Sequence, residues 1–315
     1  MKTILLTLLA LVAFAANSLL ARLALVEGAI DAASFAGIRL GSGAAILAAL
    51  VLARGGRPAG SWAGAAALAL YAVPFALAYL ALTAATGALI LFGAVQITMI
   101  GVGLRQGERP AGLEWVGLAV AVAGLVYLVS PGLAAPSPGG AAAMAVAGAA
   151  WGVYSLLGRG SGRPVATTAG NFLRATPLAL GMMAVAGLAA GSVRITVWGA
   201  LLAVVSGAVT SGLGYVVWYA ALAGLTATRA ATVQLAVPVL TAFGGVALLG
   251  EPITLRLVVA SVPILGGVLL AIRSRPVPAR MAHHGLSRSG SPAQQKHGAK
   301  SGLDWGRPRP RKEPP

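Results

Sequence analysis

The chain has 315 residues, of which 58% are hydrophobic and only 10% are charged, and its mean hydropathy is +0.86. A typical soluble domain carries about 25% charged residues, so this composition excludes a soluble globular protein and indicates a chain whose solvent is lipid. The net charge of +16 does not indicate nucleic-acid binding, because nine Lys and Arg residues lie in the Pro- and Ser-rich segment 274–315, which we predict to be a disordered cytoplasmic tail.

The sequence carries few residues suited to metal or nucleophile chemistry. It has no cysteine, which excludes disulfides and thiolate sites. Its three histidines, His283, His284 and His297, all lie in the predicted tail. We therefore expect no catalytic residue, no metal site, no cofactor and no enzyme activity.

Ten apolar segments follow one another along the chain, each near the roughly 20 residues that a transmembrane helix needs. Their approximate bounds are 3–24, 32–53, 62–81, 85–104, 113–130, 141–158, 165–187, 195–218, 228–249 and 254–272. The breaks between them are short and polar or rich in Gly and Pro, as in "RGGRPAG" and "GRGSGRP". The sequence thus predicts an all-α integral membrane protein with ten transmembrane helices, the first of which is a retained helix and not a signal peptide.

The placement of Lys and Arg predicts which ends of these helices face the cytoplasm. With a cytoplasmic N-terminus, eight basic residues lie on the inside and three, Arg22, Arg194 and Arg256, lie on the outside. The inside residues are Lys2, Arg54, Arg57, Arg105, Arg109, Arg159, Arg163 and Arg229. We expect both termini in the cytoplasm.

Three pairs of similar stretches suggest that one five-helix unit occurs twice. The joints "LRQGERPAGLEWVG" (104–117) and "ALLGEPITLRLVVA" (247–260) place Glu108 and Glu251 143 residues apart. "NSLLAR" (17–22) matches "YSLLGR" (154–159), and "GIRLGSGAAIL" (37–47) matches "NFLRATPLALG" (171–181). Because each unit has an odd number of helices, the second is inverted relative to the first, as in secondary transporters. The predicted repeats are 1–131 and 138–273, followed by the tail 274–315.

This arrangement resembles the EamA-type transporters of the drug/metabolite transporter superfamily, which carry two five-helix repeats. The resemblance covers about 1–273 and rests on the stretches "AFAANSLLAR", "FAGIRL", "FLRATP", "AAWGVYSLLGR" and the two closing joints with the apolar runs that follow them. The chain has Gln96 where the family often has Pro, and Phe14 where it often has Trp, while Pro238 is kept. The resemblance implies export of amino acids or related metabolites across a bacterial inner membrane.

Charged residues near the helix ends have both a structural and a functional interpretation. No acidic residue lies near the middle of a predicted span, which disfavours export of cationic drugs by a buried carboxylate. Glu108 and Glu251 suit the capping of a helix start, with Pro252 in the first turn, or the gating of a substrate path. Arg39 and Arg174 lie several residues inside their spans, where they either reach the interface and bond backbone carbonyls or attract a carboxylate-bearing substrate.

Amide, aromatic and proline side chains complete the candidate set. Amides inside apolar helices bond neighbouring helices or line a polar cavity, and an intramembrane Pro relieves packing or acts as a hinge. The candidate substrate-binding residues are Asn17, Arg39, Tyr79, Gln96, Tyr154, Arg174 and Gln234, and the candidate gating or joint residues are Glu108, Glu251 and Pro238.

The sequence therefore predicts a transporter that moves a small polar or zwitterionic metabolite by alternating access within the lipid bilayer. A multidrug exporter of the same superfamily is the alternative, and a lipid-modifying membrane enzyme or a non-transporting scaffold are rivals from other classes. Substrate identity, proton coupling, substrate exchange and the choice between monomer and homodimer are all left open.

Overall fold

A computed structural model describes residues 2–106, 112–130, 135–159, 161–190, 193–225, 230–231 and 233–273. Within these ranges the chain is helical, and its one β-type pairing is an isolated bridge between Ile30 and Ile195. The helices are α1 (Lys2–Val26), α2 (Ala32–Ala53), α3 (Trp62–Tyr79), α4 (Ala84–Arg105), α5 (Gly112–Val129), α6 (Pro138–Gly158), α7 (Pro164–Ala190), α8 (Val197–Val205), the π-helix η1 (Ser206–Leu213), α9 (Gly214–Leu222), α11 (Ala236–Leu249) and α12 (Leu255–Arg273).

The all-α membrane fold expected from the sequence is confirmed. Among the described residues, six helices are long and apolar enough to cross a membrane, namely α1, α2, α3, α4, α6 and the continuous run Val197–Leu222 formed by α8, η1 and α9. Shorter apolar helices lie at 115–128, 236–249 and 255–267. Each predicted span overlaps one of the helices, while the number of membrane crossings stays a prediction.

Side-chain caps explain why several helices begin where they do. Asp31, Ser61, Thr83, Ser137 and Thr196 have extended or otherwise non-helical backbones, and the side-chain oxygen of each accepts a hydrogen bond from a backbone N–H in the first turn that follows. Such a cap satisfies an N–H group that the helix itself leaves free. This matters at a membrane boundary, where water becomes scarce.

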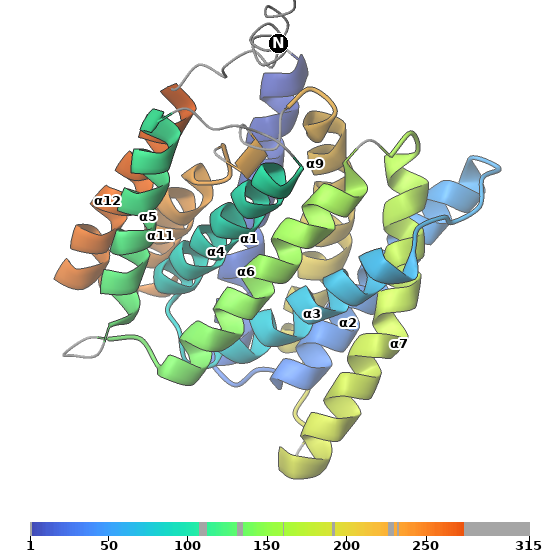
Figure 1. Ribbon diagram of the computed structural model, residues 1–315. Coiled ribbons are helices and arrows are strands. Elements are labelled where there is room, and N and C mark those ends of the chain that lie inside the picture. The colour runs from blue at the N-terminus through green and yellow to red at the C-terminus, as the bar shows by residue number, and fades with distance from the viewer. Residues whose placement is uncertain are drawn as a thin grey trace, which may run out of the picture. The chain divides into compact units, whose positions relative to one another are not determined.

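Glycine lets neighbouring helices approach until backbone meets backbone. A Cβ atom on Gly148 of α6 would lie 2.3 Å from the Leu91 carbonyl oxygen of α4, and one on Gly267 of α12 would lie 2.4 Å from the Gly117 carbonyl oxygen of α5. Small residues at helix contacts are the usual means of close packing in membranes. Figure 1 shows the result for α5 and α12, which lie side by side at one edge of the bundle.

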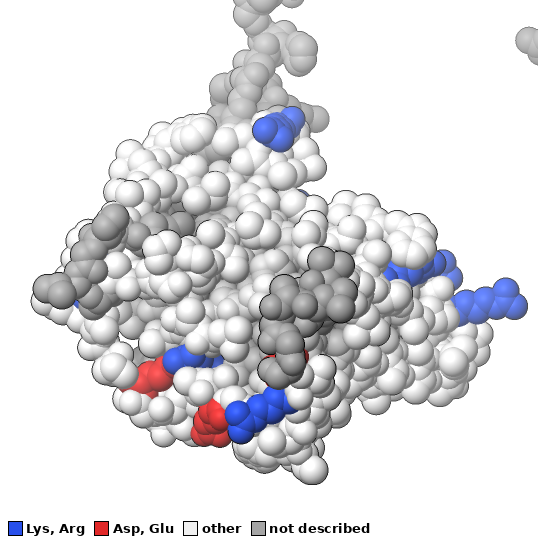
Figure 2. Space-filling view, turned by 90° about the horizontal axis from the view of Figure 1, so that it is seen from below, with Lys and Arg blue, Asp and Glu red and all other residues white. Residues whose placement is uncertain are grey.

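Acidic and basic side chains are distributed differently between the two ends of the bundle. The described acidic side chains, Glu27, Asp31 and Glu251, all lie at the end where α1 finishes and α2 and α12 begin. Figure 2 views this end and shows acidic groups next to basic ones. The opposite end carries cations without acids among the described side chains, at Arg54, Arg57, Arg105, Arg159 and Arg163.

Candidate functional site

Arg39 is the buried charge around which the middle of the bundle is organised. It lies on α2 with 1% of its surface exposed, and none of the described acidic side chains contacts it. Its Nε donates to Ser211 Oγ at 3.0 Å, and its Nη2 lies 2.9 Å from the hydroxyl oxygens of both Tyr71 and Tyr215. Its Nη1 has no hydrogen-bond partner. A buried guanidinium with a free donor group is a site prepared for an acceptor.

Asn17 of α1 extends the same hydrogen-bonded network. Its Nδ2 donates to the Tyr71 hydroxyl at 3.2 Å, and its Oδ1 accepts from Ser206 Oγ at 2.7 Å and Thr210 Oγ1 at 3.3 Å. Asn17, Ser206 and Thr210 are all buried. The Tyr71 hydroxyl thus joins Arg39 and Asn17, and we call these groups, with Ser211 and Tyr215, the central polar cluster.

The π-helix η1 places its hydroxyl groups opposite Arg39. Gly43 of α2 and Gly207 of η1 permit the two backbones to cross closely, since a Cβ on Gly207 would lie only 2.0 Å from the Arg39 carbonyl oxygen. A π-helical segment inside an α-helix is frequently found at a functional site. Here it turns Ser206, Thr210 and Ser211 toward α1 and α2.

Aromatic rings close the space beside the central polar cluster. The Phe14 ring centroid lies 5.2 Å from that of Trp151, and the Tyr71 centroid lies 5.2 Å from the same indole. The void bordered by Phe14, Asn17, Ser18, Tyr71, Leu91, Phe92 and Trp151 has a volume of about 10 Å³. That is room for one water molecule, so the structure is closed at its centre.

A second set of buried polar side chains joins α4 and α6 to the residues just before α11. Gln96 donates to the Ala231 carbonyl oxygen. Gln234 accepts from the Trp151 indole N–H at 2.9 Å and donates to the Ala230 carbonyl oxygen at 3.0 Å. Tyr154 packs with its ring centroid 5.7 Å from that of Trp151. Gln234 and Tyr154 thus contact Trp151, and the Tyr154 ring centroid also lies 6.1 Å from that of Tyr215. Gln96, Tyr154 and Gln234 make no hydrogen bond to the central polar cluster.

Arg174 lies apart from Arg39 and holds a loop. Its Nη1 donates to the carbonyl oxygens of Ala59 and Gly170 at 2.7 and 2.9 Å, and its guanidinium lies 5.9 Å from the Trp62 ring centroid. A Cβ on Gly170 would lie 1.3 Å from the Ala59 carbonyl oxygen, so α7 and the α2–α3 loop are in direct contact. Of the two roles considered for Arg174, its contacts in this structure correspond to hydrogen bonding with backbone carbonyls and not to substrate binding.

Glu251, which lies between α11 and α12, forms hydrogen bonds to the end of α1 and to the start of α4. Its Oε1 accepts from Arg22 Nε at 2.9 Å, and its Oε2 accepts from the Ala84 N–H at 2.8 Å. Arg22 Nη1 donates in turn to the Tyr79 carbonyl oxygen at 2.8 Å. We call these groups the Arg22–Glu251 clasp.

The expectation that Glu251 and Pro252 open their own helix needs a correction. Helix α12 begins at Leu255, where Thr254 Oγ1 accepts from the Leu257 N–H at 3.2 Å. The left-handed backbone of Gly250 turns the chain, so Glu251 reaches the start of α4 instead of α12. The corresponding Glu108 lies outside the described residues.

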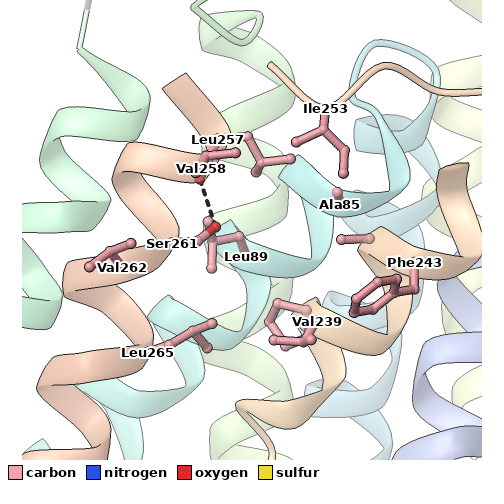
Figure 3. A pocket seen from close by; sticks show the side chains of 12 residues that line it. Ala85, Leu89, Val239, Phe243, Ile253, Leu257, Val258, Ser261, Val262 and Leu265 are labelled. Carbon is pink, nitrogen blue, oxygen red and sulfur yellow. Dashed lines mark hydrogen bonds between the residues drawn. The ribbon is translucent and has the colours of Figure 1, made fainter. Parts of the chain in front are cut away.

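A wider cavity lies away from the polar groups. It has a volume of about 270 Å³ and is formed by Ala85 and Leu89 of α4, by α11 residues that include Pro238 and Phe243, and by one side of α12. Figure 3 shows its apolar walls, with the Ser261 hydroxyl donating to the Leu257 carbonyl oxygen at 2.6 Å. Phe243 is 72% exposed. Such a groove suits hydrocarbon and offers nothing to orient a polar solute.

Sequence reasoning missed Tyr71, Ser206, Thr210 and Ser211, which make most bonds of the central polar cluster. The run "SGAVTSGL" is an unusually hydroxyl-rich stretch for an apolar span. Tyr71, Phe75 and Tyr79 recur every four residues, so they line one face of α3. These two patterns can be recognised in the sequence, but neither predicts which neighbouring helix the polar or aromatic face contacts.

A helical bundle with a closed polar cluster among long apolar helices defines a multi-pass membrane protein, and comparison with known proteins gives its family. The model of the "EamA-like transporter family" matches residues 138–273. An uncharacterised protein of Pseudomonas aeruginosa is 51% identical over 278 residues, which cover 87% of this chain and 96% of that protein. A solved crystal structure of a protein superposes with a TM-score of 0.61 at 24% identity, covering 84% of this chain and 98% of that one, and therefore shares the fold.

The chain belongs to the EamA-like transporter family. It is accordingly a membrane transporter of the drug/metabolite type. The family and the apolar helices together identify a multi-pass membrane protein.

Proposed function

We propose that the protein is a secondary-active transporter that exports a small polar or zwitterionic metabolite, such as an amino acid, from the bacterial cytoplasm. The observation that carries this proposal is Arg39, a buried cation on α2 with an unpartnered Nη1 and no acidic partner among the described residues. A substrate carboxylate would supply the missing acceptor through a charge-assisted hydrogen bond. Asn17, Tyr71, Ser211 and Tyr215 would orient the substrate beside it.

Alternating access accounts for the closed centre. The void beside Asn17 is far too small for a metabolite, so substrate enters only when the helices move apart. The Arg22–Glu251 clasp closes the end that we assign to the outside, and the packing of Arg174 on Ala59 closes the cytoplasmic end. Pro238, in the first turn of α11 and on the wall of the apolar cavity, is a candidate hinge at the start of that helix.

The packing of the helices supports two repeats, 1–131 and 138–273. If α1 to α5 correspond to α6, α7, the α8–η1–α9 run, α11 and α12, a twofold exchange relates five helix pairs. Three of these, α2–α7, α4–α11 and α5–α12, pack extensively against each other. The α3–α6 and α4–α6 contacts are likewise matched by α1–α9 and α1–α11 contacts.

The ends of the helices support an inverted orientation for the second repeat. Arg22, near the end of α1, bonds the Tyr79 carbonyl at the α3–α4 joint. A Cβ on Gly140, at the start of α6, would lie 3.2 Å from Leu82 in the same joint. The first helix of one repeat therefore ends where the first helix of the other begins. Together with the basic residues at the opposite end, this supports cytoplasmic termini in a bacterial inner membrane.

The competing functions have less support. A cation exporter of the same superfamily would need a buried carboxylate, and the described acids, Glu27, Asp31 and Glu251, lie at one end of the bundle. A lipid-modifying enzyme would need a nucleophile and a base, yet residues 1–273 contain no Cys and no His. Nothing in the described cluster favours proton coupling over substrate exchange.

Transport by the variant Arg39→Ala tests the proposal. We expect uptake of carboxylate-bearing substrates into proteoliposomes to fall at least about tenfold, the size of one charge-assisted hydrogen bond, and uptake of neutral analogues to fall much less. Arg174→Ala is the comparison variant: it removes a guanidinium at the cytoplasmic closure and outside the cluster, so any loss of uptake should be equal for carboxylate-bearing and neutral substrates. Equal losses for both substrate types in Arg39→Ala would contradict the assignment and indicate a folding role.

A further inference from the structure

We infer that the substrate is a zwitterion whose ammonium group binds to aromatic faces, those of Phe14, Tyr71 and Trp151, while its carboxylate binds Arg39. This inference rests on the proposed function and narrows its substrate class. In this inference the rings of Phe14, Tyr71 and Trp151 stabilise the positive charge of the ammonium group, as a carboxylate does in other cation sites.

A bound ammonium needs compensation because it leaves water to enter the centre of the bundle. The described acidic side chains lie at helix ends, and none borders the void beside Asn17. The walls of that void are instead rings and amide or hydroxyl groups. The π faces of Trp, Tyr and Phe attract cations, most strongly when the cation is desolvated, and Trp is the most effective.

The protein already holds its own buried cation in this way. The Arg39 guanidinium carbon lies 4.9 Å from the Tyr71 ring centroid and 4.8 Å from that of Phe75. These distances are well within the range of cation–π attraction. The Tyr71 ring also packs against Trp151, and both residues line the void beside Asn17.

A zwitterion needs its two charged groups to reach the two subsites at the same time. Tyr71 contacts both subsites at once, because its hydroxyl accepts from Arg39 Nη2 at 2.9 Å and from Asn17 Nδ2 at 3.2 Å while its ring packs on Trp151. Asn17 also lines the void, and its Oδ1, which accepts from Ser206 Oγ in the closed structure, could accept from an ammonium N–H when the cluster opens. When the cluster opens, both charged groups of the substrate would therefore lie beside Tyr71.

The test uses the purified full-length chain and the twenty standard amino acids as probes, with binding measured by thermal shift and calorimetry. The amino acid that binds most tightly is then compared with its decarboxylated amine and its deaminated acid. Two variants are matched: Trp151→Phe and Trp151→Leu both lose the indole N–H bond to Gln234, but only Trp151→Leu loses the π face.

We expect Trp151→Leu to bind the amino acid about tenfold more weakly than Trp151→Phe does, the effect of one cation–π contact. The deaminated acid should bind equally to both variants. Phe14→Leu should show the same selective loss, and it replaces the Trp151 pair if those variants do not fold. An amino-acid affinity that is the same in Trp151→Phe and Trp151→Leu, or unchanged in Phe14→Leu, would overturn the inference and leave the proposed function standing. If none of the twenty amino acids binds the wild-type chain, the inference is likewise overturned, whereas the proposed function falls only if Arg39→Ala fails its own transport test.

Discussion

Glu251 illustrates how a single carboxylate can stabilise several joints. It pairs with Arg22, accepts the Ala84 N–H at the start of α4, and both charged side chains are nearly buried, with 14% of Arg22 and 12% of Glu251 exposed. A charge-assisted hydrogen bond of this kind contributes about 2 kcal/mol. We therefore expect Glu251→Ala to lower the free energy of unfolding by about 2 kcal/mol or more, measured by denaturant unfolding in detergent micelles.

The amide variant Glu251→Gln is the control for this prediction. It keeps an acceptor for the Ala84 N–H and loses the charge that attracts Arg22, so its loss of stability should be smaller than that of Glu251→Ala. In a double-mutant cycle with Arg22→Gln, the two losses should not add, because both remove the same pair. Strictly additive losses would mean that the clasp contributes nothing as a pair.

Asp31 predicts a pH dependence at the same end of the molecule. Burial alone would raise the pKa of its carboxyl, but donation from the Ser34 N–H and hydroxyl and from the Arg194 N–H outweighs burial and lowers that pKa below its usual value. The ionised form is thus favoured by folding, and its stabilising effect is complete above the unfolded pKa of about 3.9. We expect the melting temperature of the wild-type chain to fall as the pH drops from 5 through the folded pKa. In Asp31→Asn, which has no carboxyl at this position, the same drop in pH should lower the melting temperature less. The same acid sensitivity in Asp31→Asn would rule out this carboxyl as its origin.

Arg39 and Arg174 show how far sequence reasoning reaches at single residues. Both were candidates because each places a cation inside an apolar span, and that much follows from the cost of burying charge. Their partners do not follow from the sequence. Arg39 meets hydroxyls of Tyr71, Ser211 and Tyr215 from other helices, whereas Arg174 bonds two backbone carbonyls. The difference arises from helix packing at long sequence separation, which one sequence does not specify.

The π-helix η1 is the element on which the cluster depends. Its contact with α2 leaves no room at Gly207, where a methyl group would meet the Arg39 carbonyl oxygen at 2.0 Å and Ser42 Oγ at 2.1 Å. The Ser42 hydroxyl can rotate, but the Arg39 carbonyl oxygen belongs to the α2 backbone, so Gly207→Ala must push η1 away from α2. Overpacking of this kind costs about 1–3 kcal/mol.

We therefore expect Gly207→Ala to lower the melting temperature and to reduce transport as strongly as Arg39→Ala does. The matched control is Gly101→Ala in α4, where an added Cβ meets nothing within 4 Å; it should change neither property. Wild-type transport by Gly207→Ala would show that the close crossing of η1 and α2 is not needed to position Arg39.

Helix ends were the most predictable feature of the elements, and irregularities inside them the least. The polarity breaks in the sequence lie within a few residues of most observed helix ends, because Ser61, Thr83 and Thr196 cap where apolar runs start. The span predicted at 195–218 is one continuous run in the structure, 197–222, but its π-helical middle carries no decisive sequence signal. Its geometry depends on hydrogen bonds to α1 and α2 that form only in the folded bundle.

For the whole molecule, the proposed pair of repeats and the uneven distribution of acidic and basic residues lead to one testable topology. An odd number of crossings per repeat requires the two Gly-Glu joints, at 107–108 and 250–251, to lie on opposite faces of the membrane. The mechanism depends on this, because two halves related by inversion are what make an inward-open and an outward-open state similar in energy.

The absence of cysteine makes the topology directly measurable, since each introduced thiol is the only one in the chain. We expect Pro252→Cys to react with a membrane-impermeant maleimide applied to intact spheroplasts, and Arg109→Cys to react only after permeabilisation. Val193→Cys, in the α7–α8 connection, should behave like the former, and Arg57→Cys, in the α2–α3 loop, like the latter; positions 57, 193 and 252 are all exposed. Labelling of positions 109 and 252 from the same side would remove the inversion, and with it the physical basis for alternating access through the Arg39 cluster.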